Sequence, residues 1–369
     1  MKIAILTQPL IENYGGILQN YALQTVLKKF GHEVLTLHII RVLRWQNRWF
    51  GKLYEFYVRV RNILNAILHK EPYLDQKLIS ADEKKLFLSN ITAFVNEHIN
   101  CTMPITDISQ LKNYTGFDAY IVGSDQVWRP NYSPDIYTYF LEFTPKNSMA
   151  KKIAYAASFG TSNWIFPAAM TARCKKSAAR INAISVRESN GIELCKKYLD
   201  CDAIQVPDPT LLLTADDYRK LYSDKNLSGE GKLVTYILDN SPEKELFIQK
   251  TASEMNLEVL SLQKEFSPGV KKLAIEDWLS AISNAEYVIT DSFHGTVFSI
   301  IFERQFAVIS NVARGSDRFT SLLSGLNLTG RIVDSVQLVP EAVIDYSKVN
   351  QYLSYYRQSG YDFIKNNGF

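Results

Sequence analysis

A histidine stands between two apolar runs near residue 290. His294 belongs to the tetrapeptide Ser-Phe-His-Gly at 292–295, which follows the apolar residues 287–290 and precedes the apolar residues 296–302. This order predicts a buried strand, a tight turn and a helix, with the imidazole beside the N–H groups that begin the helix. Such a place attracts anions and disfavours a protonated imidazole, so His294 could accept a proton. The alternative is that His294 only caps the helix or fills a pocket.

Asp125 is the second candidate for proton transfer. It follows the apolar residues 119–122 within the hexapeptide Gly-Ser-Asp-Gln-Val-Trp, which places it at the carboxyl end of a predicted strand. There the carboxylate can act as a general base or hold an acceptor hydroxyl, and Trp128 can stack on a sugar ring. The alternative is that Asp125 is an N-cap.

Arginines follow two other predicted strands. Arg187 comes after one of them, and Arg314 and Arg318 come after another. A guanidinium forms forked pairs with a carboxylate or a phosphate. Together with His294, these arginines predict a cleft lined with positive charge that fits a small, doubly anionic substrate. For Arg187 the alternative is a salt bridge to Glu188 or to another acid.

A turn with paired glycines ends the first predicted strand and opens the first helix. Its residues are Asn13, Tyr14, Gly15 and Gly16. Glycines allow the backbone to approach a ligand closely, and the N–H groups beyond them can bind an anion or a sugar hydroxyl. The turn is neither a dinucleotide-binding fingerprint nor a P-loop. A tight turn without a ligand is the alternative.

The sequence has no metal-binding motif. None of its five histidines stands at zinc spacing, and its four cysteines form no Cys-x-x-Cys pair, which is typical of free thiols in a reducing compartment. No apolar stretch has the length of a membrane span. We therefore expect a cytoplasmic protein without a metal or another cofactor. The formal net charge of +3 is too small to indicate a nucleic-acid partner.

Apolar strands alternate with helical patterns along the 369 residues, which predicts an α/β fold with parallel sheets covered on both faces. The expected strands are residues 2–6, 33–37, 119–122, 153–156, 183–186, 204–206, 232–238, 258–262, 287–290 and 306–309. Pro207 and Pro209 favour a domain boundary. We predict a first domain at 1–206, a second at 207–345 and a helical tail at 346–369. Two facing sheets would leave a cleft at the carboxyl ends of their strands, where ligands bind.

A predicted helical insert at 41–100 interrupts the first domain. Its residues 41–70 contain seven basic side chains and one acid, Glu55, interleaved with aromatic residues. A basic helix with aromatic rings suits an anionic membrane surface. The alternative is a helical hairpin packed on the sheet with a solvated basic face.

Five motifs in this order resemble the polysaccharide pyruvyl transferase family. They are Asn-Tyr-Gly-Gly at 13–16, Gly-Ser-Asp-Gln at 123–126, Ser-Val-Arg-Glu at 185–188, Val-Pro-Asp-Pro-Thr at 206–210 and Asp-Ser-Phe-His-Gly at 291–295. The resemblance implies two facing Rossmann-like domains, similar to those of B-type glycosyltransferases. It also implies a reaction that moves a pyruvyl group from phosphoenolpyruvate onto a sugar as a cyclic ketal.

The resemblance implies a phosphoenolpyruvate site at His294, Arg187 and Arg314, although some relatives have lysine in place of Arg314. We predict proton transfer by His294 and Asp125. The predicted donor-binding residues are Arg187, Ser292, Phe293, Gly295, Arg314 and Arg318. The predicted acceptor-binding residues are Asn13, Tyr14, Gly15, Gly16 and Trp128.

The expected partners are phosphoenolpyruvate and a saccharide acceptor, linked to lipid at the inner face of the membrane, in the synthesis of a capsule or exopolysaccharide. Two alternatives stay open. One is a glycosyltransferase that uses a nucleotide sugar, although the sequence shows no clear base-stacking slot with a ribose-binding acid. The other is a non-enzymatic, membrane-associated component of a polysaccharide assembly complex.

Overall fold

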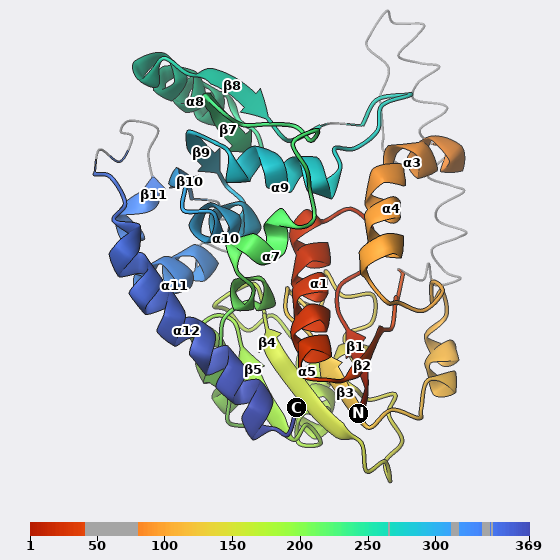
Figure 1. Cartoon of the computed structure of the whole chain (residues 1–369). Helices are drawn as coiled ribbons and strands as arrows, with labels where there is room; N and C mark the ends of the chain where they lie inside the picture. The colour runs from red at the N-terminus through yellow and green to blue at the C-terminus, as the bar shows by residue number, and fades with distance from the viewer. Residues whose placement is uncertain (41–79, 265, 311–316, 334–339, 341) are drawn as a thin grey trace, which may run out of the picture.

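Two parallel β-sheets, each covered by helices, form the two halves of the molecule (Figure 1). The structure is a computed structural model that describes residues 1–40, 80–264, 266–310, 317–333, 340 and 342–369. The prediction of two parallel α/β domains is confirmed by these sheets. The boundary predicted at residue 207 falls in the segment between them.

The first sheet has six parallel strands in the order β2-β1-β3-β4-β5-β6. They are β1 (Lys2–Leu6), β2 (Glu33–Thr36), β3 (Ala119–Val122), β4 (Lys151–Ala157), β5 (Ala183–Val186) and β6 (Ile204–Gln205). The chain reverses its direction across the sheet between β1 and β3. Ligands of doubly wound folds bind at such a switch point, beyond the carboxyl ends of the strands.

The second sheet has five parallel strands in the order β11-β10-β9-β7-β8. They are β7 (Lys232–Tyr236), β8 (Glu258–Ser261), β9 (Tyr287–Thr290), β10 (Gln305–Ile309) and β11 (Ile332–Val333). Its switch point lies between β7 and β9. The sequence did not predict β11, because two residues are too few to form a pattern.

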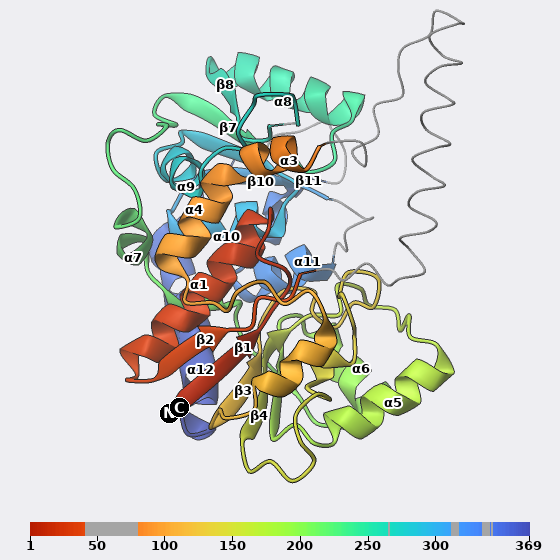
Figure 2. The same ribbon diagram turned by 90° about the vertical axis from the view of Figure 1, so that its right-hand side faces the viewer.

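Helices cover both faces of each sheet. In the first half of the chain they are α1 (Tyr14–Lys29), α3 (Ala81–Phe87), α4 (Ser89–His98), η2 (Ile108–Asn113), η3 (Thr138–Phe140), α5 (Ala168–Ala178), α6 (Asn190–Leu194) and η4 (Cys195–Leu199). In the second half they are η5 (Pro209–Leu212), α7 (Ala215–Arg219), α8 (Pro242–Met255), α9 (Ile275–Ser283), α10 (Phe293–Ile301), α11 (Asp317–Gly325), η7 (Thr329–Arg331) and α12 (Tyr346–Asn366). Figure 2 shows α1 and α12 on one face of the first sheet and α5 and α6 on the other.

Asn13 caps the start of helix α1. The side chain of Asn13 accepts a hydrogen bond from the Gly16 N–H at 3.2 Å, which satisfies one of the free donors of the first turn. The helix therefore includes Tyr14 and both glycines of the predicted turn. It stops before Gly31, whose φ of 83° ends the helical path.

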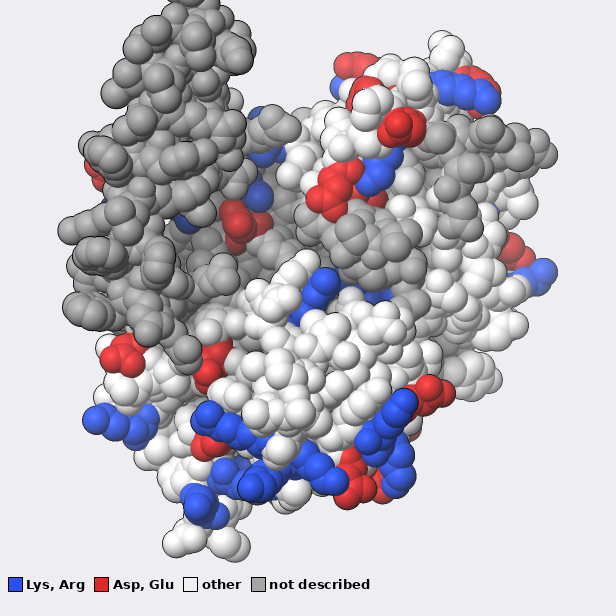
Figure 3. Space-filling view, turned by 180° about the vertical axis from the view of Figure 1, so that it is seen from behind, with Lys and Arg blue, Asp and Glu red and all other residues white. Residues whose placement is uncertain are grey.

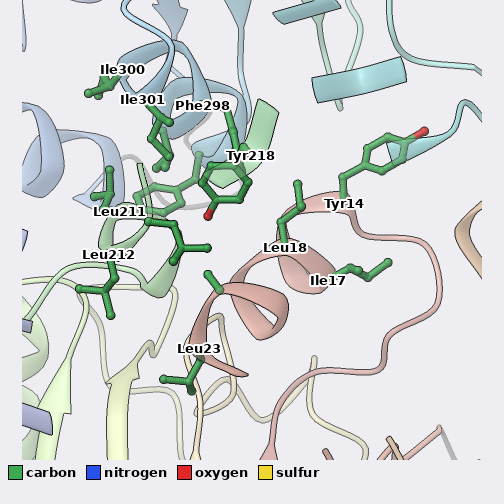
Figure 4. Packing of buried hydrophobic residues seen from close by; sticks show 14 of the residues in the cluster. Tyr14, Ile17, Leu18, Leu23, Leu211, Leu212, Tyr218, Phe298, Ile300 and Ile301 are labelled. Carbon is green, nitrogen blue, oxygen red and sulfur yellow. The ribbon is translucent and has the colours of Figure 1, made fainter. Parts of the chain in front are cut away.

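One apolar cluster joins the two halves of the molecule (Figure 4). It includes Leu18 of α1, Leu211 of η5, Tyr218 of α7 and Phe298 of α10, all of which are buried. Burial of such side chains stabilises a fold by roughly 1.5–3 kcal/mol each. The two switch points are therefore held together by a shared core.

Helix α12 crosses from the second sheet to the first, as Figures 1 and 2 show. Near its end the Arg357 Nε donates to the Leu211 carbonyl at 2.7 Å, and the Lys151 Nζ donates to the Asn367 carbonyl at 2.9 Å. The ring of Phe369 lies 6.1 Å from the ring of His32. Both ends of the chain therefore lie beside the first sheet.

The predicted insert is described only in its last part, where α3 and α4 are helical. The Asn90 side chain of α4 donates to the Lys272 carbonyl at 2.8 Å, so this part contacts the second half of the chain. Residues 41–79, and with them the basic aromatic stretch, lie outside the described residues. The predicted membrane contact stays a prediction.

The described surface mixes both signs of charge. On the face in Figure 3, basic and acidic side chains are interspersed, and basic ones gather along its lower edge. Among the helices of the described ranges, none is both long and apolar enough to cross a membrane.

Candidate active site at the domain junction

The starts of α1 and α10 meet at His294. A Cβ placed on Gly15 would lie only 1.9 Å from the His294 Nδ1, so the imidazole lies directly against the backbone of α1. Only glycine leaves that space empty. The sequence predicted that Gly15 admits a ligand, whereas the structure brings His294 itself to this position.

His294 is the second residue of α10 and is 6% exposed. Its Nε2 lies 3.6 Å from the Asp208 Oδ2, which is longer than a hydrogen bond. The Ser292 side chain caps α10 by accepting from the Gly295 N–H at 3.4 Å. The capping role therefore belongs to Ser292, and His294 is free of it.

Asp208 contacts Ser124, Arg187, Thr210 and His294, and these buried residues form a polar cluster around its carboxylate. Its Oδ2 accepts from the Ser124 Oγ at 2.8 Å and from the Arg187 Nη1 at 3.0 Å, and its Oδ1 accepts from the Thr210 Oγ1 at 2.7 Å. Burial would raise the pKa of the Asp208 carboxyl, but the adjacent His294 and the Arg187 guanidinium hold that pKa well below its usual range. Asp208 is therefore an anion that faces His294.

Three carboxylates surround Arg187. In addition to Asp208, the Arg187 Nε donates to the Glu188 Oε1 at 2.9 Å, and the Nη2 lies 3.9 Å from the Asp125 Oδ1. Burial would lower the pKa of Arg187, but these three carboxylates raise it above its usual value. The alternative of a salt bridge to Glu188 is therefore realised. Of the nitrogens of its guanidinium, only the Nη2 has no hydrogen-bond partner among the described residues.

The predicted lining of positive charge needs correction. The described cluster places Asp125, Glu188 and Asp208 around Arg187, so its guanidinium is not open to a forked pair with a dianion. The sequence indicated Glu188 as a partner but could not reveal Asp125 and Asp208, because these two acids follow other strands.

Two guanidiniums lie close to the ring of Phe293. The Arg187 Cζ is 4.3 Å and the Arg318 Cζ is 5.8 Å from the centroid of that ring. Burial and the charge of Arg187 lower the pKa of Arg318 to about 10, so Arg318 is still a cation at neutral pH. A buried cation beside another cation is stabilised by an anionic ligand.

Asp125 has a left-handed backbone with a φ of 73°, which is uncommon for residues other than glycine. Its carbonyl accepts from the Ser158 N–H at 3.1 Å, and its Oδ2 accepts from the Asn13 Nδ2 at 3.4 Å. No helix begins directly after Asp125, so it is not an N-cap. Such backbone strain is common at functional sites.

Two predicted acceptor residues are packing residues instead. Trp128 is fully buried, its ring stacks on Phe140 at 4.8 Å, and its Nε1 donates to a backbone carbonyl. Tyr14 stacks on Trp278 at 5.6 Å, and its hydroxyl donates to the Leu273 carbonyl at 2.7 Å. Neither ring offers a free face to a sugar.

The other predicted residues lie at the start of the two helices. Gly16 is close to the Asp125 side chain, and a Cβ on Gly295 would lie 2.4 Å from the Thr290 Oγ1. Arg314 lies outside the described residues. Sequence reasoning missed the role of Asp208. The signal available for Asp208 was an acid between two prolines directly after a strand.

Within the described ranges, no group of three or more His, Cys, Asp or Glu side chains is arranged to hold a metal ion. The expectation that the protein works without a cofactor stays a prediction.

These features define a two-domain α/β protein whose two switch points meet at a buried ionic site. A family model described as "Polysaccharide pyruvyl transferase" matches residues 13–312, which is more than half of the chain. The chain therefore belongs to the polysaccharide pyruvyl transferase family, as its five motifs predicted. No curated protein matches the chain in sequence.

Several solved structures are similar to this chain. A putative UDP-N-acetylglucosamine 2-epimerase from Listeria monocytogenes is 9% identical, with a TM-score of 0.48 and coverage of 97% of this chain and 91% of that one. The UDP-GlcNAc 2-epimerase from Neisseria meningitidis, bound to UDP-GlcNAc, is 9% identical, with a TM-score of 0.46 and coverage of 98% and 94%. A mutant O-GlcNAc transferase from Thermobaculum terrenum is 9% identical, with a TM-score of 0.43, and the match covers 98% of this chain but 64% of that one.

Proposed function

We propose that this protein transfers a pyruvyl group from phosphoenolpyruvate to two hydroxyls of a saccharide and forms a cyclic ketal. The observation that carries the proposal is the His294–Asp208 pair beside the buried guanidiniums of Arg187 and Arg318. A proton-transfer group next to cations suits a donor that carries a carboxylate and a phosphate. Family membership supports the transfer of a pyruvyl group to a polysaccharide.

The reaction needs a proton to be delivered and two to be removed. The methylene carbon of phosphoenolpyruvate takes up a proton, and the first acceptor hydroxyl adds to the neighbouring carbon. The bond from that carbon to the phosphate oxygen then breaks, and the second hydroxyl closes the ketal. One hydroxyl proton replaces the proton that was delivered, and the other leaves with inorganic phosphate.

His294 is the residue that we assign to proton transfer, and Asp125 is the second candidate. Asp208 faces the His294 Nε2 at 3.6 Å, and an anion in that position can orient the imidazole. Asp208 therefore acts as a positioning residue.

Arg318 and the Arg187 Nη2 are the described groups that we assign to the donor's anionic oxygens. The Nη2 is buried and has no hydrogen-bond partner in the described part of the chain. Arg314, Ser292, Phe293 and Gly295 stay in the proposed donor site as predicted. A lipid-linked acceptor, a role in capsule or exopolysaccharide synthesis and a place at the inner face of the membrane also belong to the proposal.

Calorimetric titration tests the donor. Phosphoenolpyruvate should bind the wild type, and Arg318→Gln should weaken that binding by about tenfold or more, since it removes a charged hydrogen-bonding group. Arg219→Gln is the matched control, because this exposed arginine pairs with the exposed Asp216 at 2.8 Å. Binding of UDP-GlcNAc in place of phosphoenolpyruvate would move the protein to the glycosyltransferase alternative.

Replacement of His294 tests the chemistry. His294→Gln should lower phosphate release in the presence of acceptor saccharides by about 10²–10⁴-fold, because general acid–base catalysis contributes that much. Binding of phosphoenolpyruvate should change less than threefold. Unchanged turnover in this variant would rule out the assignment of His294.

A further inference from the structure

A cavity opens between the two halves of the molecule, near the buried ionic site. Its volume is about 530 Å³, within the usual range of ligand pockets. Ser189, Asn190 and Gln205 line it from the first half, and residues of α11, among them Ser324 and Gly325, line it from the second. The predicted acceptor residues Tyr14 and Trp128 do not reach it, because both are packed in the core.

The lining is polar but uncharged. All eight lining residues are neutral, and seven of them carry a hydroxyl or an amide. Four of these side chains have no hydrogen-bond partner anywhere in the described part of the chain: Ser162, Ser189, Asn190 and Ser324. Unused hydroxyls and amides fit the neutral hydroxyls of a sugar, whereas no lining residue offers a cation to a carboxylate.

The cavity adjoins the two arginines of the ionic site. The Gln205 Nε2 donates to the Arg187 carbonyl at 3.1 Å and to the Ser321 Oγ at 2.9 Å. Ser321 stands one helical turn after Arg318, so both side chains are on the same side of α11. A ligand in the cavity would therefore lie close to the backbone of Arg187 and to the first turn of the helix that carries Arg318.

We propose that this cavity binds a neutral pyranose unit, the part of the acceptor that precedes or carries the reacting hydroxyls. The role as acceptor site rests on the proposed function, whereas the carbohydrate site itself does not. The cavity determines specificity by charge, because neutral sugars match its lining and uronates do not.

Gly325→Trp fills the cavity. A Cβ placed on Gly325 meets no atom within 4 Å, so the indole can be accommodated without a backbone clash. Gly116→Trp is the matched control, because Gly116 is equally open and lines a different cavity of about 490 Å³ at the start of β3. Saturation-transfer NMR with the methyl glycosides of galactose, glucose, N-acetylglucosamine and glucuronic acid measures binding.

We expect at least one neutral glycoside to bind the wild type and Gly116→Trp but not Gly325→Trp. The glucuronide should bind more weakly. Ser324→Ala should weaken binding by about three- to tenfold, as expected for one lost hydrogen bond, and should keep the fold because alanine favours helix. The Ser324→Ala variant therefore tests the proposal even if the indole of Gly325→Trp disturbs folding.

Two results would overturn the inference: binding that persists in Gly325→Trp, or no neutral glycoside bound by the wild type at millimolar concentration. Tighter binding of the glucuronide would overturn the choice of a neutral sugar. Titration of phosphoenolpyruvate against the same variants separates the two proposals. If phosphoenolpyruvate fails to bind while Gly325→Trp abolishes glycoside binding, the proposed function fails and the carbohydrate site stands.

Discussion

Asp208 serves two neighbours, since one oxygen faces both the guanidinium of Arg187 and the imidazole of His294. A buried carboxylate that loses its charge leaves the Arg187 cation with fewer counter-charges in a medium of low dielectric constant. The residue that sequence reasoning passed over is thus the one on which both the stability of the cluster and the orientation of His294 depend.

Asp208→Asn should lower the free energy of unfolding by about 3–5 kcal/mol at pH 7, the usual cost of breaking a buried charge pair. The pKa of Asp208 is held below its usual value, so its contribution is complete above the ordinary carboxyl pKa and is lost as the pH falls toward the folded value. The difference from the wild type should therefore stay constant from pH 7 to about pH 5 and shrink as the pH falls below about 4.

Urea unfolding at several pH values measures this difference. Asp202→Asn is the control, because this exposed carboxylate pairs with Lys196 at 2.9 Å and should change stability by less than about 1 kcal/mol. A constant difference between Asp208→Asn and the wild type down to pH 3 would contradict the assignment.

At the scale of elements, α1 and α10 define the site by how closely their first turns approach. Gly15→Ala would introduce a Cβ 1.9 Å from the His294 Nδ1, so the imidazole must move. We expect phosphate release to fall by more than about 100-fold, as small displacements of catalytic groups do. Gly16→Ala is the milder comparison, because its Cβ would meet the Asp125 Oδ2 at 3.3 Å.

Thermal unfolding accompanies the kinetic measurement. Both variants should melt within a few degrees of the wild type, since alanine suits a helix better than glycine. Equal activity of Gly15→Ala and the wild type would show that the imidazole can work from another position.

The elements that the sequence predicted well are those with uniform patterns. The apolar runs of β3, β5 and β9 gave the correct bounds, because central parallel strands are buried on both faces. The convergence of Asp125, Arg187 and His294 also followed from strand ends. The sequence offered Glu188 as a partner of Arg187, but Asp125 and Asp208 become partners only through tertiary packing. The burial of Trp128 could not be told from exposure to a ligand.

At the scale of the whole molecule, α12 follows the second half of the chain and packs against the first half. Gly360 lies against the first half so tightly that a Cβ there would be 2.6 Å from the Tyr155 Oη. Gly360→Val should detach this end of α12 and lower the free energy of unfolding by about 2 kcal/mol or more. Gln358→Val is the control, because this neighbouring residue of the same helix is exposed.

Limited proteolysis and differential scanning calorimetry measure the effect. Gly360→Val should be cleaved faster near its C-terminus and should show a broader transition than Gln358→Val. Identical digestion patterns of the two variants would mean that the contact with Tyr155 contributes little.

The contact of α12 with the first sheet also bears on the order in which the chain is made. Synthesis on the ribosome delivers β1 to β6 long before Gly360, Phe363 and Phe369, yet these residues contact Tyr155 of β4 and His32, which stands next to β2. The first half of the chain is translated first, but its packing is complete only after α12 has been synthesised. The apolar surface that α12 covers therefore stays exposed while the second half is synthesised. An exposed apolar surface makes a nascent chain prone to aggregation during that period.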